Sequence, residues 1–407
     1  MNLIVAQSGG PTSVINSSLC GVIDAGILEE FDNIYLSRFG IEGLIRGEIV
    51  SVDKDKFIKN NIKDKLMARP SSILGSCRFK LSDDLNDEVY KKIFDRFEEY
   101  DISSFVYIGG NDSMDTVSKL NSYMRENSIS GINIVGCPKT IDNDLCQMDH
   151  SPGFASAAKF INQTISQMRL DVDVYQLKSV TFVEIMGRNA GWLAGSSLLS
   201  NYKRDRKVVN LLYLPEDDKS IDEILDDIKI SLKEESNLIV AVAEGFMDRD
   251  KILLKESISN TADGFSHKVI AGVANRLADI VRDELNIKSR NVELNICQRT
   301  NTIISKTDSL EAYQLGFRAA SVSKDKTNLL PIIKREESND YKINYSFVAS
   351  EEIANKERKI PQEWLDDRNL LEEKMIAYTY PLIQGEISIA YENGLPVFVN
   401  LCDFIIK

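Results

Sequence analysis

Histidine is almost absent from this chain, and cysteine occurs without a repeated spacing. Only two histidines, His150 and His267, are found among 407 residues. A serine–histidine–aspartate triad or a multi-histidine metal centre is therefore nearly excluded. The six cysteines form no C-x-x-C pair, which argues against a zinc ribbon or a disulfide framework and favours reduced thiols.

Several widespread active-site motifs are missing as well. The sequence contains no G-x-S-x-G nucleophile elbow, no Gly-Lys dipeptide of the kind a P-loop needs, and no G-x-G-x-x-G dinucleotide fingerprint. Serine hydrolases, P-loop nucleotidases and ordinary dehydrogenases therefore lose their usual sequence evidence.

Membrane and nucleic-acid functions are also disfavoured. No stretch approaches the roughly 20 apolar residues that span a bilayer, and the N-terminal segment lacks the basic start and long apolar core of a signal peptide. We therefore expect a cytoplasmic protein. The formal net charge is −13, which argues against a surface that coats nucleic acid but allows a few local arginines to hold an anionic substrate.

Short apolar runs rich in valine, isoleucine and tyrosine recur along the chain between amphipathic segments. Their hydrophobicity is continuous rather than alternating, which is typical of parallel strands buried on both faces. One amphipathic segment opens with Ser220-x-x-Glu223, a capping-box spacing. The alternation predicts an α/β fold, with strands at Leu3–Ala6, Ser104–Ile108, Asn133–Val135, Val180–Ile185, Leu211–Leu214 and Leu238–Ala243.

Glycines and polar residues follow several of these strands directly. The only two Gly-Gly pairs, Gly9-Gly10 and Gly109-Gly110, both lie at predicted strand ends. Ligands of open α/β sheets bind beyond the carboxyl ends of strands, and paired glycines let backbone N–H groups approach an anion. A tight turn without a ligand would use the same residues, so these loops alone leave both interpretations open.

The segment Pro138–Asp144 places a lysine, a threonine and two aspartates after one of these strands. Asp142 and Asp144 could simply cap a turn. Alternatively, a carboxylate could act as a base beside the ammonium of Lys139, which would stabilise a transferring phosphoryl group. Three arginines could be solvated or could each clamp a phosphate: Arg78, Arg188 and Arg299.

A set of motifs in a fixed order reveals a family resemblance. The motifs are Leu-Gly-Ser-Cys-Arg (74–78), Gly-Gly-Asn-Asp-Ser (109–113), Pro-Lys-Thr-Ile-Asp-Asn-Asp (138–144), Pro-Gly-Phe-Ala-Ser-Ala-Ala-Lys (152–159), Glu-Ile-Met-Gly-Arg-Asn-Ala-Gly-Trp (184–192), Ala-Glu-Gly (243–245) and Gln-Arg (298–299). With this combination the chain resembles the phosphofructokinase family, and more closely its pyrophosphate-dependent branch. The resemblance implies two Rossmann-like three-layer α/β domains with parallel-rich sheets and a C-terminal extension.

The resemblance implies reversible phosphoryl transfer from pyrophosphate to the 1-hydroxyl of fructose 6-phosphate, with Mg²⁺. Asp142 matches the family's general base, and Gly10 and Arg78 match positions that hold the donor phosphates. Asn111 stands where the family has a metal-binding carboxylate, so Asp112 or the substrate could carry more of that role. The implied sugar-phosphate site comprises Thr140, Ile141, Asp142, Met186, Gly187, Arg188, Glu244, Arg290, Ile296, Cys297, Gln298 and Arg299.

Asp112 and Lys139 favour pyrophosphate over ATP as the donor. ATP-using relatives have glycine at both places. A carboxylate at residue 112 would repel the α-phosphate of a nucleotide, and an ammonium at residue 139 could bind pyrophosphate and compensate charge in the transition state. The alternatives are an ATP-dependent phosphofructokinase, a related kinase acting on NAD or a lipid, and a non-catalytic sugar-phosphate sensor, which would need no base.

The resemblance also predicts how the chain is divided and assembled. We expect a pyrophosphate domain made of residues 1–138 and 250–306, and a sugar-phosphate domain made of residues 139–249 and 307–407. Residues 320–407 are expected to pack around the second domain. Because family members complete their site with residues from a neighbour, a homodimer or homotetramer is expected.

Overall fold

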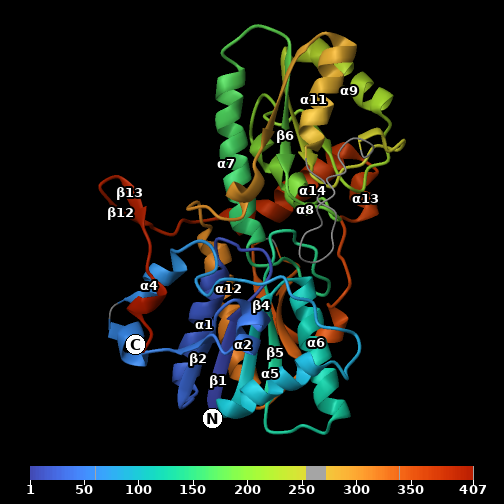
Figure 1. The fold of residues 1–407 in the computed structure, drawn as a ribbon. Coiled ribbons are helices and arrows are strands. Elements are labelled where there is room, and N and C mark those ends of the chain that lie inside the picture. Colours follow the sequence, from blue (N-terminus) through green and yellow to red (C-terminus); the bar gives the residue numbers. More distant parts are fainter. Residues whose placement is uncertain (60, 254–271, 339, 407) are drawn as a thin grey trace.

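Two parallel-rich sheets, one in each half of the molecule, organise the fold (Figure 1). The computed structural model describes residues 1–59, 61–253, 272–338 and 340–406. The first sheet has the order β3-β2-β1-β4-β5, and within it β3 runs antiparallel to β2 while the other pairs are parallel. Its strands are β1 (Asn2–Gln7), β2 (Asn33–Ser37), β3 (Ile49–Ser51), β4 (Ile102–Gly109) and β5 (Asn133–Pro138).

Helices cover both faces of this sheet. Successive side chains of β1 point to opposite faces, so Leu3 and Val5 join one core and Ile4 and Ala6 join the other. The first face is covered by α1 (Ile15–Leu28) and α12 (Lys306–Ser323). The second face is covered by α2 (Gly40–Arg46), α5 (Glu88–Glu99) and α6 (Asn111–Glu126). The result is a three-layer α/β arrangement.

The second sheet repeats this design in the other half of the molecule. Its order is β7-β8-β6-β9, with all neighbours parallel; its strands are β6 (Ser179–Ile185), β7 (Leu211–Tyr213), β8 (Asn237–Ala243) and β9 (Lys288–Glu293). One face packs on α7 (Phe154–Val172), α8 (Trp192–Gly195) and α14 (Arg368–Thr379). The other face packs on α9 (Ile221–Glu234) and α11 (Val273–Leu285).

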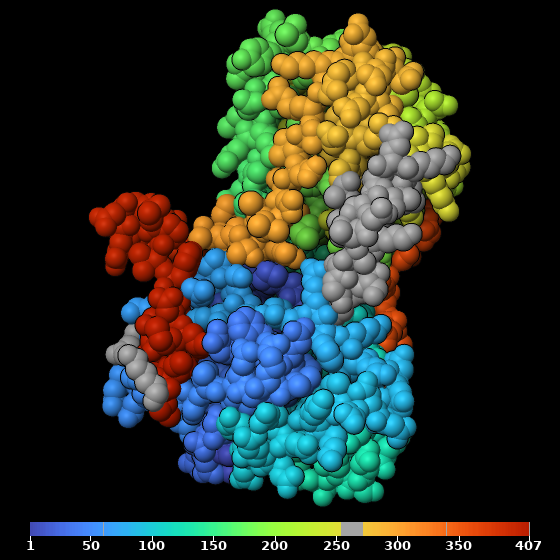
Figure 2. Space-filling model, viewed as in Figure 1, coloured from blue at the N-terminus to red at the C-terminus, as the bar shows by residue number. Residues whose placement is uncertain are grey.

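The C-terminal residues contact both halves of the molecule rather than the second half alone. The hairpin of β10 (Leu329–Arg335) and β11 (Ile343–Ala349) packs on the first core, as does Phe404. In contrast, α13 (Gln362–Leu365) and α14 pack on the second core. Figure 2 shows the red C-terminal residues against the blue half, with the hairpin of β12 (Ala390–Glu392) and β13 (Leu395–Val397) projecting at the left. The remaining short elements are α3 (Lys54–Lys59), α4 (Ile62–Met67) and the 3₁₀ turns η1 (Ser196–Asn201), η2 (Asn295–Gln298), η3 (Ser350–Glu352), η4 (Tyr380–Ile383) and η5 (Leu401–Asp403).

The strand pairings differ from the predicted division of the chain at two segments. β9 pairs with β6, so residues 288–293 lie in the second sheet rather than with residues 1–138. α12 lies against α1, so residues 306–323 lie with the first sheet. The reason is close helix packing, since a Cβ atom on Gly316 would lie 1.9 Å from the carbonyl oxygen of Ser18. We therefore propose that α11 and β9 belong to the second domain, and α12 and β10 to the first.

The predicted strands and the predicted capping box are confirmed. Each of the six predicted runs coincides with a strand, from β1 to β8. The Ser220 side chain accepts a hydrogen bond from the Glu223 backbone, and the Glu223 carboxylate accepts one from the Ser220 backbone. In the part of the chain that the structure describes, no helix has the length and apolar character needed to cross a membrane.

Candidate active site

Lys139 lies buried where two loops of the first sheet meet. Its Nζ donates to the carbonyl oxygens of Ser8, at 2.9 Å, and Gly10, at 2.7 Å. A Cβ atom on Gly9, whose φ is +73°, would lie 3.4 Å from that nitrogen, so glycine both adopts the left-handed backbone and leaves room for the ammonium. Burial lowers the pKa of Lys139 to about 7, although the Asp142 carboxylate opposes the shift.

The loop after β5 is held against the start of α7. The backbone N–H of Thr140 donates to the carbonyl of Pro152 at 3.1 Å. The hydroxyl of Thr140 in turn accepts a hydrogen bond from the backbone N–H of Asp142 at 3.2 Å. These contacts orient the loop so that the half-buried Asp142 lies in the same cluster of charges as Lys139.

The two aspartates of this loop both titrate abnormally. Burial raises the pKa of Asp142, and the charges of Arg188, Lys139 and Arg299 oppose that rise. Burial, followed by repulsion from Asp142, raises the pKa of Asp144 to about 7. Asp142 is therefore a carboxylate that binds a proton more readily than an ordinary aspartate, with cations close enough to favour its ionised form.

Two loops of the second sheet complete the other wall of the site. They follow the neighbouring strands β6 and β8, and the Arg188 Nε lies 3.5 Å from the Glu244 Oε1. The backbone N–H of Gly245 donates to the carbonyl of Gly187 at 3.2 Å, and a Cβ atom on Gly245 would lie 1.9 Å from the carbonyl oxygen of Arg188. Burial, followed by the charge of Asp142, raises the pKa of Glu244 to about 7.

Gln298 and Arg299 reach the site through η2. Gln298 is 1% exposed and accepts a hydrogen bond from the backbone N–H of Met186 at 3.1 Å, so it holds the loop after β6. The Arg299 Nη1 would lie 3.4 Å from a Cβ atom on Gly10, so this arginine spans from the second half to the Gly-Gly loop of the first. Burial and the nearby charge of Arg78 lower the pKa of Arg299. Loops from both sheets thus converge on one cluster of cations and carboxylates.

Asn111 and Asp112 lie in the first turn of α6, where the helix dipole favours negative charge. The Asn111 amide donates to the carbonyl of Lys356 at 2.6 Å and accepts from the backbone N–H of Asn355 at 2.6 Å. Among the described residues, no three histidine, cysteine or acidic side chains form a ready-made metal cage. This donor set fits a divalent ion shared with substrate phosphates, because Mg²⁺ commonly uses one or two protein carboxylates and takes its other ligands from phosphate and water.

Several predicted site residues lie outside this cluster. Arg290 lies within β9 and pairs with Asp171 at 3.4 Å, near the end of α7 that is remote from the loop after β5. Ile141 is buried in the core beside α7. Ile296 and Cys297 are exposed on η2.

Two residues that sequence reasoning missed hold the loop after β5 from behind. The Arg358 Nη2 donates to the carbonyl of Asn143 at 2.9 Å, and its backbone N–H donates to the carbonyl of Asp144 at 2.7 Å. The Tyr378 hydroxyl accepts from the Asn143 side chain at 2.7 Å. Arg358 follows Asn143 by 215 residues, so no local motif could have linked them.

Comparison with known proteins places this geometry in context. Residues 2–323 match the family model described as Phosphofructokinase. A pyrophosphate--fructose 6-phosphate 1-phosphotransferase of Halomonas elongata is 33% identical over 98% of this chain and 96% of the relative. The enzyme of the same name from Methylococcus capsulatus is 32% identical over 99% of this chain and 96% of the relative. The crystal structure of a pyrophosphate-dependent phosphofructokinase from Nitrosospira multiformis covers 100% of this chain and 98% of its own, with a TM-score of 0.86 and 29% identity.

Proposed function

Because this chain belongs to the phosphofructokinase family, we infer that it transfers a phosphoryl group reversibly between pyrophosphate and the 1-hydroxyl of fructose 6-phosphate. The forward reaction yields fructose 1,6-bisphosphate and phosphate. The observation that carries this inference is the buried Lys139 ammonium in one charge cluster with the half-buried Asp142, between loops of both sheets. Phosphoryl transfer asks mainly for positioning and electrostatic stabilisation, and this cluster can supply both.

Asp142 acts as the general base. It takes the proton of the 1-hydroxyl while that oxygen forms a bond to phosphorus, and the bridging P–O bond of pyrophosphate breaks with its electron pair leaving on phosphate. The raised pKa of Asp142 makes it a better proton acceptor than an ordinary aspartate. A general base must be ionised before it can accept a proton. The nearby cations support this role because they favour the ionised form of Asp142.

Lys139 binds the donor and stabilises its developing charge. A lysine ammonium has three N–H donors, and two of them are used by the carbonyls of Ser8 and Gly10. Among the residues that the structure describes, the third has no acceptor, so it can bind a phosphate oxygen. Gly10 and Arg78 contribute to the same donor site, and Asp112 disfavours ATP because its carboxylate repels a nucleotide α-phosphate.

The sugar phosphate binds on the side of the second sheet. Arg188 and Arg299 supply positive charge for its phosphate, and Glu244 accepts a hydrogen bond from a sugar hydroxyl. Thr140, Met186, Gly187 and Gln298 shape the loops around it, whereas Ile141, Ile296 and Cys297 lie outside the cluster of this chain. A glutamate with a pKa of about 7 is a suitable partner for a hydroxyl group, since either of its protonation states can form the bond.

A divalent cation, which we propose is Mg²⁺, would be held by Asp112 and the second lone pair of the Asn111 amide oxygen together with phosphate oxygens. When bound, it neutralises phosphate charge during transfer. Asn111 was predicted as the metal ligand. Its amide already donates to the carbonyl of Lys356 and accepts from the backbone N–H of Asn355, so we propose that it shares the metal with Asp112.

We further propose that the protein is a cytoplasmic homodimer or homotetramer. Arg290 lies away from the cluster of its own chain, where it pairs with Asp171. In an oligomer this arginine serves the sugar-phosphate site of a neighbouring copy.

The choice of donor tests the proposal. Fructose 1,6-bisphosphate formation from fructose 6-phosphate should be measured with pyrophosphate and, separately, with ATP, and the reverse reaction should be started from phosphate. We expect kcat/KM with pyrophosphate to exceed that with ATP by about 100-fold or more, which is a difference that a charge clash can supply. Equal or better turnover with ATP would identify an ATP-dependent kinase, and binding of fructose 6-phosphate without turnover of either donor would identify a sensor.

A further inference from the structure

Four consecutive residues of the C-terminal segment contact three of the loops that converge on the candidate active site. Residues 355–358, which we call the strap, lie between η3 and α13. Ile353 belongs to the first core and Ile360 to the second, so the strap crosses from one half of the molecule to the other. Arg358 is half-buried and the other three residues of the strap are exposed, so hydrogen bonds rather than core packing hold this segment.

The strap begins at the first turn of α6, which carries the proposed donor residues. The Asn111 amide donates to the carbonyl of Lys356 and accepts from the backbone N–H of Asn355, both at 2.6 Å. The Asn355 side chain also donates to the Asp115 carboxylate at 2.7 Å, one turn further along the helix. Three hydrogen bonds therefore fix this end of the strap to the loop after β4.

Arg358, the last residue of the strap, joins the two ends of the loop after β5. Its Nη2 donates to the carbonyl of Asn143 at 2.9 Å, and its backbone N–H donates to the carbonyl of Asp144 at 2.7 Å. Its Nη1 donates to the carbonyls of Met148, at 3.2 Å, and Asp149. A guanidinium presents its donors in fixed directions, so it can bond both ends of the loop at once, whereas a lysine ammonium is a compact charge on a flexible stem.

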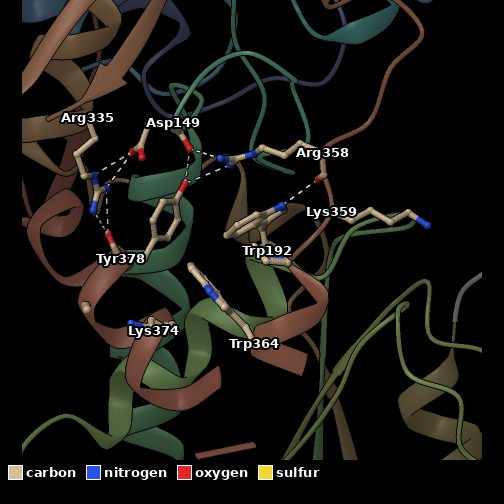
Figure 3. A pocket seen from close by; sticks show the side chains of 10 residues that line it. Asp149, Trp192, Arg335, Arg358, Lys359, Trp364, Lys374 and Tyr378 are labelled. Carbon is tan, nitrogen blue, oxygen red and sulfur yellow. Dashed lines mark hydrogen bonds and ion pairs between the residues drawn. The ribbon is translucent and has the colours of Figure 1, made fainter. Parts of the chain in front are cut away.

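The same end of the strap is attached to the segment after β6. The Asn189 side chain donates to the Glu357 carboxylate, and the Trp192 Nε1 donates to the carbonyl of Arg358 at 2.9 Å. Figure 3 shows the guanidinium of Arg358 over the ring of Trp192, 4.3 Å from its centroid, and directed at the Tyr378 hydroxyl. The segment after β6 also supplies an arginine of the proposed sugar-phosphate site. The strap thus connects the donor, base and sugar loops.

We propose that the strap holds these three loops in a fixed arrangement and that Arg358 is a positioning residue for Asp142. The proposal rests on the proposed function, because Arg358 acts only through the general base. It bonds to the backbone of the two residues that directly follow Asp142, so a change at Arg358 moves the carboxylate relative to the 1-hydroxyl. A displacement of about 1 Å at a reacting group can lower the rate by about 100-fold.

A conservative variant tests the role of the guanidinium. Arg358→Lys keeps the positive charge and loses the fork, so kcat should fall by about tenfold or more while KM for fructose 6-phosphate and for pyrophosphate stays within about threefold of the wild-type value. The control Arg368→Lys, at an exposed arginine that pairs with Asp217, should behave as the wild type. An unchanged kcat, or a raised KM with an unchanged kcat, would overturn the positioning role.

An exposed residue of the strap provides a variant that leaves both cores intact. Glu357→Ala removes the acceptor of the Asn189 side chain, so kcat should fall by about threefold or more, the effect of one hydrogen bond to a charged group. Glu363→Ala, at an exposed glutamate on α13, is the matched control. Equal kcat values for these two variants would show that the strap does not arrange the loops.

A double-mutant cycle separates positioning of the base from general support of the fold. In the Asp142→Asn background there is no base to position, so Arg358→Lys should change the residual kcat by less than about twofold. The same fold-loss in both backgrounds would overturn the proposal while leaving Asp142 as the base. A wild-type protein that turns over neither pyrophosphate nor ATP would instead contradict the proposed function, and the positioning role with it.

Discussion

The ammonium of Lys139 is buried against two backbone carbonyl groups, and a buried ammonium holds its proton less tightly than one in water. With a pKa of about 7, Lys139 is close to half protonated in the free protein at neutral pH. An arriving pyrophosphate favours the protonated form. Donor binding and proton uptake are therefore linked at this residue.

This linkage predicts that kcat/KM for pyrophosphate decreases at alkaline pH. Because the pKa of Lys139 is lowered to about 7, the cation is lost above that pH, and kcat/KM for pyrophosphate should fall by about tenfold per pH unit beyond it. Lys139→Met should have a low kcat/KM for pyrophosphate that does not show this decrease above pH 7. The ratio of wild type to variant cancels the ionisation of pyrophosphate itself. A ratio that stays constant from pH 6 to pH 9 would show that deprotonation of Lys139 does not cause the decrease in kcat/KM.

Asp112 can be tested as the residue that excludes ATP. Replacing Asp112 by glycine removes the carboxylate that repels the α-phosphate, so kcat/KM for ATP should rise by about tenfold or more while that for pyrophosphate falls. Steady-state kinetics with both donors measure the two effects. Asp205→Asn, at an exposed site away from the cluster, is the control. If ATP use does not increase, exclusion of the nucleotide has another cause.

At the scale of elements, the continuous apolar runs of β1 and β4 to β8 were predictable, whereas β2, β3 and β9 of the same two sheets were not. Runs such as Val180–Ile185 are apolar throughout because helices cover both faces of their sheet. β9 escaped prediction because it is an edge strand that carries Lys288, Arg290 and Glu293. Its membership of the second sheet depends on pairing with β6, which no local pattern reveals.

The residues of the candidate site also divide into those that the sequence could predict and those that it could not. Asp142, Lys139 and Arg188 follow strands directly, so their convergence could be predicted from the rule that ligands bind at the carboxyl ends of strands. Arg358 and Tyr378 lie on the C-terminal segment and reach the same loop only through the tertiary fold. Arg290 was predicted from the family pattern and lies on β9, where it pairs with Asp171 of its own chain, so the role proposed for it requires a neighbouring copy.

The crossing of α1 and α12 gives a stability prediction at this scale. Gly21 and Gly316 face the opposite helix so closely that a Cβ atom on Gly316 would meet the backbone of Ser18 at 1.9 Å. Gly316→Ala should therefore lower the free energy of unfolding by about 3 kcal/mol or more. Chemical denaturation measures the change. Ser321→Ala on the same helix should change it little, and a similar loss in both variants would contradict the proposed packing.

At the scale of the whole molecule, an acidic protein encloses a cationic site. The net charge is −13, yet the charges of Lys139, Arg188 and Arg299 gather around Asp142 where loops of the two halves meet. Such an arrangement concentrates positive charge where the proposed function requires phosphates to bind. The buried carboxylates near these cations have raised pKa values, so they make the stability of the fold depend on pH.

Glu244 provides a test of this dependence. Its pKa is raised to about 7 in the folded protein from an ordinary value of 4.5. Such a group contributes stability that is fully present below pH 4.5 and is lost as the pH rises to 7. The melting temperature of wild type minus that of Glu244→Gln should therefore decrease from pH 5 to pH 7, without ligands. A difference that is constant or rises across this range would contradict the raised pKa.

The most direct measurement is the turnover number of Asp142→Asn with pyrophosphate and fructose 6-phosphate. The amide is close in shape to the carboxylate but cannot accept the proton of the 1-hydroxyl. We predict that kcat falls by about 10²–10⁴-fold while fructose 6-phosphate still binds and the melting temperature is not lowered. A kcat within threefold of the wild-type value would contradict the assignment of Asp142 as the base.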